Sequence, residues 1–348
     1  MKSEDIARLA GVSRSTVSRV INNYPNVPDA TRDKVMRIIA EMGYEPNTSA
    51  QILAGKSNNT IGLFVVSIYD RNNIYQSSYY SSIINAAVDA SNSSGYYVLI
   101  HTVYSAEDYY RITQTFLQKR ISGGILVGNE KDTGEIKKLL KTGVPIGIVD
   151  YDPASIDKVP EDCKGLAILN SADYDAARRA VEYLYCLGHR RIGVIAGRLQ
   201  TFSGRQRYQG YLDAMRAMKL TVDERYVMHG DFLHKTARAE VMRMLAQGSL
   251  PDAIVSCNDD MAVAALDVLR ENEISVPRDV SIIGFDDSPM SAQSSPRLTT
   301  FRVPLYEMVT RVTEKVIASI EGEGEGYYHS TLPLELIERE SCRTATEQ

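Results

Sequence analysis

The stretch EDIARLAGVSRSTVSRVINN, residues 4–23, predicts two short helices joined by a tight turn. Gly11 suits a backbone position with positive φ, where the chain can turn sharply after the first helix. Ser13 stands where a side-chain oxygen can cap the second helix. The apolar residues at helical spacing, which we expect to pack between the two helices, are Ile6, Leu9, Ala10, Val17, Val20 and Ile21. The opening stretch therefore indicates a small all-α module.

The second of these helices presents an unusual outward face. Once its apolar side chains turn inward, the residues left outside are Arg14, Ser15, Ser18, Arg19 and Asn22. A short helix with an outward face of Arg, Ser and Asn is what the major groove of DNA accepts. A generic three-helix packing module is the alternative.

Several motifs favour the DNA-binding interpretation. Asp5-Ile6-Ala7, Ala10-Gly11-Val12-Ser13 and Thr16-Val17-Ser18-Arg19-Val20 resemble the helix-turn-helix of the LacI/GalR family of bacterial repressors. Thr31–Val35, Gly43–Asn47, Ala50 and Leu53–Lys56 continue the resemblance at that family's spacing. In one departure, Lys2 replaces the family's capping Thr, so Ser3 is expected to cap the first helix. The residues expected to contact DNA are Ser13, Arg14, Ser15, Thr16, Ser18, Arg19, Asn22, Thr31, Asn47, Ala50 and Leu53.

The chain is expected to divide into four parts: a helix-turn-helix domain at 1–46, a hinge at 47–57, an effector-binding and dimerisation domain at 58–342 and a tail at 343–348. A third helix over Asp29–Met42, with Val35, Ile38, Ile39 and Met42 as its apolar stripe, closes the head. The hinge could be a plain linker, because its apolar strip is too narrow to fold alone. The resemblance implies instead a helix that pairs on operator DNA and wedges Leu53 into the minor groove.

From Thr60 onward, short β-rich runs alternate with stretches of helical length. A first series is Ile61–Val66, Tyr97–Val103, Gly124–Val127 and Val144–Val149, and a second is Gly165–Leu169, Ile192–Ala196, Ala253–Ser256 and Val280–Phe285. Apolar strands between helices predict parallel sheets covered on both faces. We therefore expect two α/β subdomains, with crossings near 153–160, 286–296 and 322–326. This arrangement resembles the periplasmic-binding-protein fold that the family uses as its sensor.

Polar residues at strand ends mark a candidate ligand cleft. Asp150, Asn258 and Asp286 each follow an expected strand, where open α/β sheets bind ligands. By resemblance, Arg207 is the cleft arginine, and the flanking aromatic rings are Tyr79, Tyr80 and Phe232. Such a set suits a sugar. Alternatives remain: Arg207 and Asp286 could pair with each other, Asn258 could cap a helix, and the aromatic residues could be core.

Composition bounds the remaining possibilities. Residues 1–57 hold eight Lys/Arg and six Asp/Glu, whereas the whole chain has a net charge of −5, so a basic head joins an acidic body. With no bilayer-length apolar run and no secretory signal, we expect a cytoplasmic protein that does not contact membranes. The chain has no phosphate or dinucleotide motif, no metal-ligand spacing and no nucleophile–base pair, so we expect no cofactor, no metal site, no catalytic residues and no enzymatic activity. His189 is expected to be structural, and the Asp259-Asp260 and Asp286-Asp287 pairs are not expected to hold a metal ion.

Together these features favour a transcriptional regulator, expected to be a repressor, that binds pseudo-palindromic operator DNA under the control of a small molecule, most simply a sugar. A homodimer is expected because no leucine heptads follow Cys342. The alternatives are the same architecture with a purine-like corepressor, and a solute-binding protein without a transcriptional role.

Overall fold

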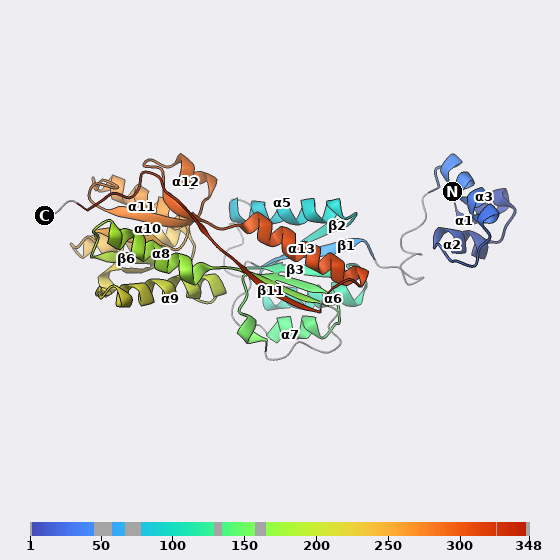
Figure 1. Cartoon of the computed structure of the whole chain (residues 1–348), viewed down its shortest axis with the longest axis horizontal. Coiled ribbons are helices and arrows are strands. Elements are labelled where there is room, and N and C mark those ends of the chain that lie inside the picture. The colour runs from blue at the N-terminus through green and yellow to red at the C-terminus, as the bar shows by residue number, and fades with distance from the viewer. Residues whose placement is uncertain are drawn as a thin grey trace. The chain divides into compact units, whose positions relative to one another are not determined.

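The computed structural model describes residues 2–44, 58–66, 78–128, 134–156, 165–324 and 326–345. The chain divides into two compact units, Met1–Asn58 and Asn59–Gln348 (Figure 1). The smaller unit is all-α, and the larger contains two six-stranded sheets with helices on their faces. The expected fold class is therefore confirmed.

The small unit, called the head, consists of α1 (Ser3–Ala10), α2 (Arg14–Ile21) and α3 (Asp29–Glu41). Its buried core is Ile6, Ala7, Ala10, Val17, Val20, Val27 and Val35. The expectation that Leu9 joins this core is wrong, because Leu9 is 51% exposed. On a helix with about 3.6 residues per turn, Ile6, Ala7 and Ala10 share one face and Leu9 lies outside it.

The ends of the head helices correct two further expectations. Lys2, not Ser3, is the N-cap of α1, and its backbone N–H donates to the Asp5 carboxylate at 3.0 Å. Met42 lies just beyond α3 and is 45% exposed, so it does not extend the apolar stripe. The turn is as expected: Gly11 has φ 65°, and Ser13 Oγ accepts from the Thr16 N–H.

The first sheet of the large unit has the strand order β11-β5-β4-β3-β1-β2, and all its neighbouring strands are parallel. The strands are β1 (Thr60–Val66), β2 (Tyr97–Val103), β3 (Gly123–Val127), β4 (Ile146–Val149), β5 (Leu166–Ser171) and β11 (Tyr327–Leu332). The helices of this subdomain are α5 (Ser78–Ser93), α6 (Ala106–Leu117), α7 (Gly134–Leu140) and α13 (Leu305–Glu321). Helices α5 and α13 share one apolar cluster with the sheet, and α6 and α7 share another.

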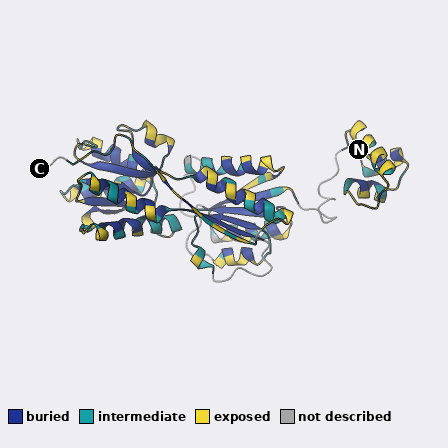
Figure 2. Ribbon diagram, viewed as in Figure 1, coloured by how far each residue is buried: buried dark blue, intermediate teal, exposed yellow. Residues whose placement is uncertain are grey.

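The second sheet has the order β12-β10-β9-β8-β6-β7, parallel except for the β10–β12 pair. The strands are β6 (Ile192–Ala196), β7 (Val227–His229), β8 (Ala253–Ser256), β9 (Ser281–Asp286), β10 (Thr299–Arg302) and β12 (Glu335–Ile337). The helices are α8 (Asp173–Cys186), α9 (Phe202–Ala217), α10 (His234–Ala246), α11 (Asp259–Glu271) and α12 (Pro289–Gln293), with the short turn η2 (Glu224–Tyr226). The other short turn, η1 (Pro153–Ser155), lies between β4 and β5 in the first subdomain. Figure 2 shows the central strands of both sheets as buried.

The chain crosses between subdomains at places other than those expected. Strand β5 belongs to the first sheet, so the first crossing is at Ala172, before α8. The second is at Val303–Pro304, between β10 and α13, and the third at Pro333–Leu334, between β11 and β12. The proline- and glycine-containing segments near 153–160, 286–296 and 322–326 instead include η1, α12 and the left-handed cap of α13 at Gly322. Gly165–Leu169, expected in the second series, accordingly lies in the first subdomain.

Candidate functional sites

The candidate DNA-contacting residues of the head lie mainly on α2. Ser13, Arg14, Ser15, Ser18 and Arg19 are exposed, whereas Thr16, Asn22 and Thr31 are half-buried. The Arg14 guanidinium forms an ion pair with Glu4 at 3.2 Å. The Arg19 guanidinium has no hydrogen bond or ion pair with any residue that the structure describes. Asn47, Ala50 and Leu53 lie outside the described residues.

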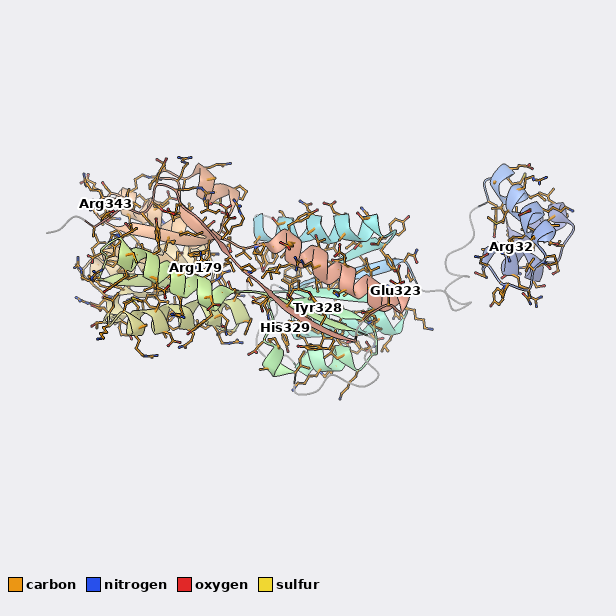
Figure 3. All side chains as sticks on the ribbon, in the orientation of Figure 1. Arg32, Arg179, Glu323, Tyr328, His329 and Arg343 are labelled. Carbon is orange, nitrogen blue, oxygen red and sulfur yellow. The ribbon has the colours of Figure 1, made fainter. Side chains whose placement is uncertain are left out.

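One basic residue of the head serves to hold its loop. Arg32 (labelled in Figure 3) donates to the Asn23 side-chain oxygen and to the Tyr24 carbonyl, both at 2.7 Å. These bonds hold the segment that follows α2 against α3. Ser13 Oγ is likewise engaged, by the Thr16 N–H and by the hydroxyls of Ser15 and Thr16.

The larger unit contains a cavity of about 330 Å³ lined by residues of both subdomains. Tyr79, Tyr80 and Asp150 come from the first subdomain, and Arg207, Phe232, Asn258 and Asp286 from the second. All seven candidate effector residues therefore face one space. The strand positions explain this convergence, because Asp150 follows β4, Asn258 lies just beyond β8 and Asp286 ends β9.

Arg207 is the most deeply buried cation of the cavity lining. It is 5% exposed, its Nε donates to Asp173 Oδ1 at 2.7 Å, and its Nη1 lies 3.6 Å from Asp286 Oδ1. Nη1 also donates to the Cys257 carbonyl, and the guanidinium carbon lies 4.7 Å from the centre of the Phe285 ring. Burial lowers the pKa of Arg207, but the neighbouring Asp173 and Asp286 outweigh it and raise the pKa above its usual value.

The principal partner of Arg207 is a residue that sequence reasoning missed. Asp173, 1% exposed, is the first residue of α8 and also accepts from the Ser171 hydroxyl at 2.6 Å. Asp286 is the ion-pair partner that the sequence suggested for Arg207, and that pair exists but is the longer of the two. The available signal was the position of Asp173 just past the carboxyl end of β5, which the misassigned strand series concealed.

Asp150 links the two subdomains. Its carboxylate accepts from both the backbone N–H and the hydroxyl of Ser203, each at 2.7 Å, at the first turn of α9. A second link is the ion pair between Asp152 and Arg205 at 3.3 Å. Burial raises the pKa of Asp150 to about 6, with a further contribution from Asp173, and the Ser203 hydrogen bonds oppose this rise. Ser203 was also missed by sequence reasoning.

Asp286 and Asp287 have opposite electrostatic surroundings. Burial raises the pKa of Asp286 well above its usual value; Arg207 opposes this rise, whereas Asp259 and Asp260 add to it. Asp287 forms ion pairs with Arg302 at 2.8 Å and Arg339 at 2.5 Å, and together these lower its pKa despite burial. Asp286 is therefore the carboxyl group whose charge the protein compensates less completely.

The remaining candidates combine a structural role with a place in the lining. Asn258 caps α11 by accepting from the Met261 N–H at 2.9 Å, and it donates to the Phe232 carbonyl at 3.3 Å. Tyr79 and Tyr80 meet edge to face with ring centres 5.4 Å apart, and both pack against the first subdomain's core. Phe232 packs against the second. Each of these residues can therefore cap a helix or pack in the core and also line the cavity.

His189 has structural surroundings. His189 is 3% exposed, and its Nε2 lies 3.0 Å from the Arg343 carbonyl oxygen. Across the described ranges, no cluster of three or more His, Cys, Asp or Glu residues could hold a metal ion. Within the same ranges, no helix has the length and apolar character needed to cross a membrane.

A small helix-turn-helix head joined to a two-sheet body with a central cavity defines a class of ligand-regulated DNA-binding proteins. Residues 4–47 match the model of bacterial regulatory proteins of the lacI family, and residues 181–342 match that of a periplasmic binding protein-like domain. The transcriptional regulator CelR of Thermobifida fusca is 31% identical over 338 residues, covering 97% of both chains. The chain belongs to the lacI family and is a DNA-binding transcriptional regulator.

Two solved structures are similar over almost their whole length. A lac repressor dimer bound to operator and the anti-inducer ONPF is 28% identical, with a TM-score of 0.81 and coverage of 99% of both chains. A complex of the regulator CelR with cellobiose is 30% identical, with a TM-score of 0.74 and coverage of 98% of this chain and 99% of that one.

Proposed function

We propose that this regulator is a homodimeric repressor whose operator binding is controlled by a sugar or sugar derivative bound in the cavity. The observation that carries the proposal is the convergence of Asp150, Arg207 and Asp286 with aromatic rings in one space of about 330 Å³. Such a volume lies within the range of small-molecule sites. The similar structures, one a CelR complex with cellobiose and the other a lac repressor dimer on operator, support the same proposal.

The chemistry of the lining suits hydroxyl groups. The carboxylates of Asp150 and Asp286 can accept from sugar hydroxyls, and Arg207 can donate to them. The faces of Phe232, Tyr79 and Tyr80 can pack against the C–H face of a sugar ring. These six residues, with Asn258, are the effector contacts that we propose.

Control requires that the effector distinguish two arrangements of the subdomains. The Asp150–Ser203 hydrogen bonds and the Asp152–Arg205 ion pair join the subdomains beside the cavity. A ligand that uses Asp150 changes the strength of this connection. We propose that such a change alters the relative position of the subdomains and thereby operator affinity.

On the DNA side, we propose that Arg14, Ser15 and Arg19 read base edges while Ser13, Thr16, Ser18, Asn22 and Thr31 position the head. Residues 47–57 act as the hinge, with Asn47, Ala50 and Leu53 meeting the minor groove, and the division at 1–46, 47–57, 58–342 and 343–348 is part of the proposal. The exposed polar face of α2 and the match to the lacI family over residues 4–47 support it.

The test combines operator selection with an effector panel. Promoter fragments of the organism that bind the full-length protein are selected and footprinted. The affinity of the protein for these fragments is then measured with and without neutral sugars or hypoxanthine. We expect a palindromic footprint, lost on deletion of residues 1–57, and a change of affinity with a sugar. A response to hypoxanthine alone would support a purine-like corepressor instead, and binding of sugar without any DNA binding would contradict the regulatory proposal.

A further inference from the structure

The cavity carries an excess of acidic side chains. The charged residues that line it, among those the structure describes, are Asp150, Asp231, Asp260, Asp286, Asp287, Arg198, Arg207 and Arg302. Five carboxylates thus face three guanidinium groups. In a partly enclosed space, where water screens charges less than in bulk solution, such an imbalance sets the sign of the local potential.

Two of the three arginines already direct their N–H groups at the protein's own carboxylates. Arg207 is held by the buried Asp173 and by Asp286, as its distances of 2.7 and 3.6 Å show. Arg302 donates to Asp287 and Glu335, at 2.8 and 3.0 Å. An arriving anion would compete with these carboxylates, and displacing Asp173 would leave a charge in the protein interior.

The carboxyl groups respond to this environment. Burial raises the pKa of Asp260, and His234 opposes this rise. Desolvation and neighbouring aspartates likewise raise the pKa values of Asp150 and Asp286. The surroundings of three lining carboxyl groups therefore already destabilise their ionised forms. A further negative charge would raise their pKa values more, whereas a hydroxyl or ammonium donor would stabilise their ionised forms.

Resting on the proposed function, we infer that the effector carries no negative charge. It is a neutral or amine-bearing polyhydroxy compound, and sugar acids, sugar phosphates and nucleotides are excluded. The carboxylate excess explains why neutral and amine-bearing compounds are accepted, because it offers acceptors to hydroxyl and ammonium groups. It also explains why anions are excluded, because it repels carboxylate and phosphate groups.

Calorimetric titration of the full-length protein with matched sugars tests this inference. The probes are glucose, glucosamine, glucuronamide, glucuronate and glucose 6-phosphate; galactose with its corresponding derivatives; ribose with ribose 5-phosphate; and cellobiose. The amide and the acid differ in charge but hardly in size, so their comparison separates repulsion from steric exclusion. In the series that binds, we expect the anionic members to bind at least about tenfold more weakly than the neutral ones.

A charge variant identifies the origin of that difference. In the Asp231→Asn/Asp260→Asn double variant, the difference in affinity between glucuronamide and glucuronate should shrink by about tenfold. If another series binds instead, the same holds for its neutral and anionic members. Glu314→Gln, an exposed residue of α13 outside the lining, should leave the difference unchanged. An anionic sugar that binds as tightly as its neutral counterpart would overturn the inference but leave a sugar effector standing. Failure of every sugar to bind would overturn both.

Discussion

At the scale of single residues, Arg207 has two carboxylate partners with different surroundings. Asp173 is 1% exposed and belongs to the interior, whereas the Asp286 side chain is 22% exposed and lines the cavity. The shorter bond goes to the interior partner. Part of the guanidinium's function is therefore to neutralise a buried charge, and Asp286 is the member of the trio that a ligand can engage without exposing that charge.

Substitution should separate these roles. Arg207→Ala removes the partner of the buried Asp173 and is expected to destabilise the body by about 3–5 kcal/mol. Asp286→Asn keeps the volume and leaves the Arg207–Asp173 pair intact, so we expect a near-normal melting temperature, normal operator binding and no response to effector. Thermal melting measures the stability of each variant, and operator titration with and without effector measures its response. Normal effector affinity in Asp286→Asn would make the Arg207–Asp286 contact purely structural.

The two exposed arginines of α2 offer a second comparison. Arg14 forms an ion pair with Glu4 at 3.2 Å, whereas the Arg19 side chain has no such partner among the described residues. We expect Arg19→Ala and Arg14→Ala each to relax specificity at particular base pairs, at a cost of about 1–3 kcal/mol per lost bidentate contact. Binding to a set of single-base operator variants measures this. An equal loss of affinity on every sequence would instead assign these residues to phosphate contacts.

The pKa of Asp150, raised to about 6, predicts a pH-dependent stability. A carboxyl group with a folded-state pKa above its unfolded value near 3.8 takes up a proton on folding, so its contribution is favourable at low pH and is lost as pH rises through about 6. Between pH 7 and 5 this group should add about 1 kcal/mol to the free energy of unfolding. Denaturant unfolding of wild type and Asp150→Asn at both pH values measures the difference.

Asp259, whose pKa is also raised to about 6, provides the internal control, because its dependence should persist in Asp150→Asn. If Asp150→Asn and wild type gain the same stability between pH 7 and 5, the carboxyl group of Asp150 does not titrate in this range.

At the scale of elements, apolar strand runs were predicted well and the connections between subdomains were not. β6 and β8 have the expected bounds, because a buried parallel strand reads as a continuous apolar run. β2 also has the expected bounds, although it is an edge strand whose residues are mostly exposed or half-buried. The short or polar strands β7, β10, β11 and β12 were missed. Their membership of a sheet depends on pairing with distant strands, such as β11 with β5, which local pattern does not encode.

The predicted positions of the crossings were wrong for a related reason. Proline and glycine were taken to mark links between subdomains, yet Gly322 ends α13 and Pro289 begins α12. The true links, such as Pro333–Leu334, are too short to have a compositional signature. Placing β5 in the wrong series also hid Asp173, so the cavity residues at strand ends were predicted while the charge behind Arg207 was not.

The hinge, residues 47–57, is an element whose prediction rests on sequence alone. Ala50, Leu53 and Ala54 form an apolar strip too narrow to fold by itself, so Leu53 should act in the DNA complex. We expect Leu53→Ala to weaken operator binding while leaving the melting temperature and effector affinity unchanged. Operator titration and calorimetry test this. A large fall in melting temperature without DNA would make Leu53 a core residue.

At the scale of the whole molecule, each unit has its own apolar core. The head's cluster uses residues from Ile6 to Tyr44, and the body's clusters use residues from Ile61 to Cys342. Three chain crossings, at Ala172, Val303–Pro304 and Pro333–Leu334, tie the body's two sheets together. Sensing and DNA reading are thus built on separately stabilised structures, and this independence can be tested directly.

A fragment comprising residues 59–348 should fold and bind effector as the full chain does. Both sheets, all three crossings and the whole described cavity lining lie within it, so neither its core nor its site depends on the head. We expect its melting temperature to match the body transition of the full-length protein, its effector dissociation constant to agree within about twofold, and operator binding to be absent. Calorimetry on both proteins measures the first two quantities. Since both would be compared at the same concentration, dimerisation through the body would affect them equally. A fragment that melts much earlier, or that loses effector affinity, would show that the head or the hinge stabilises the sensing body.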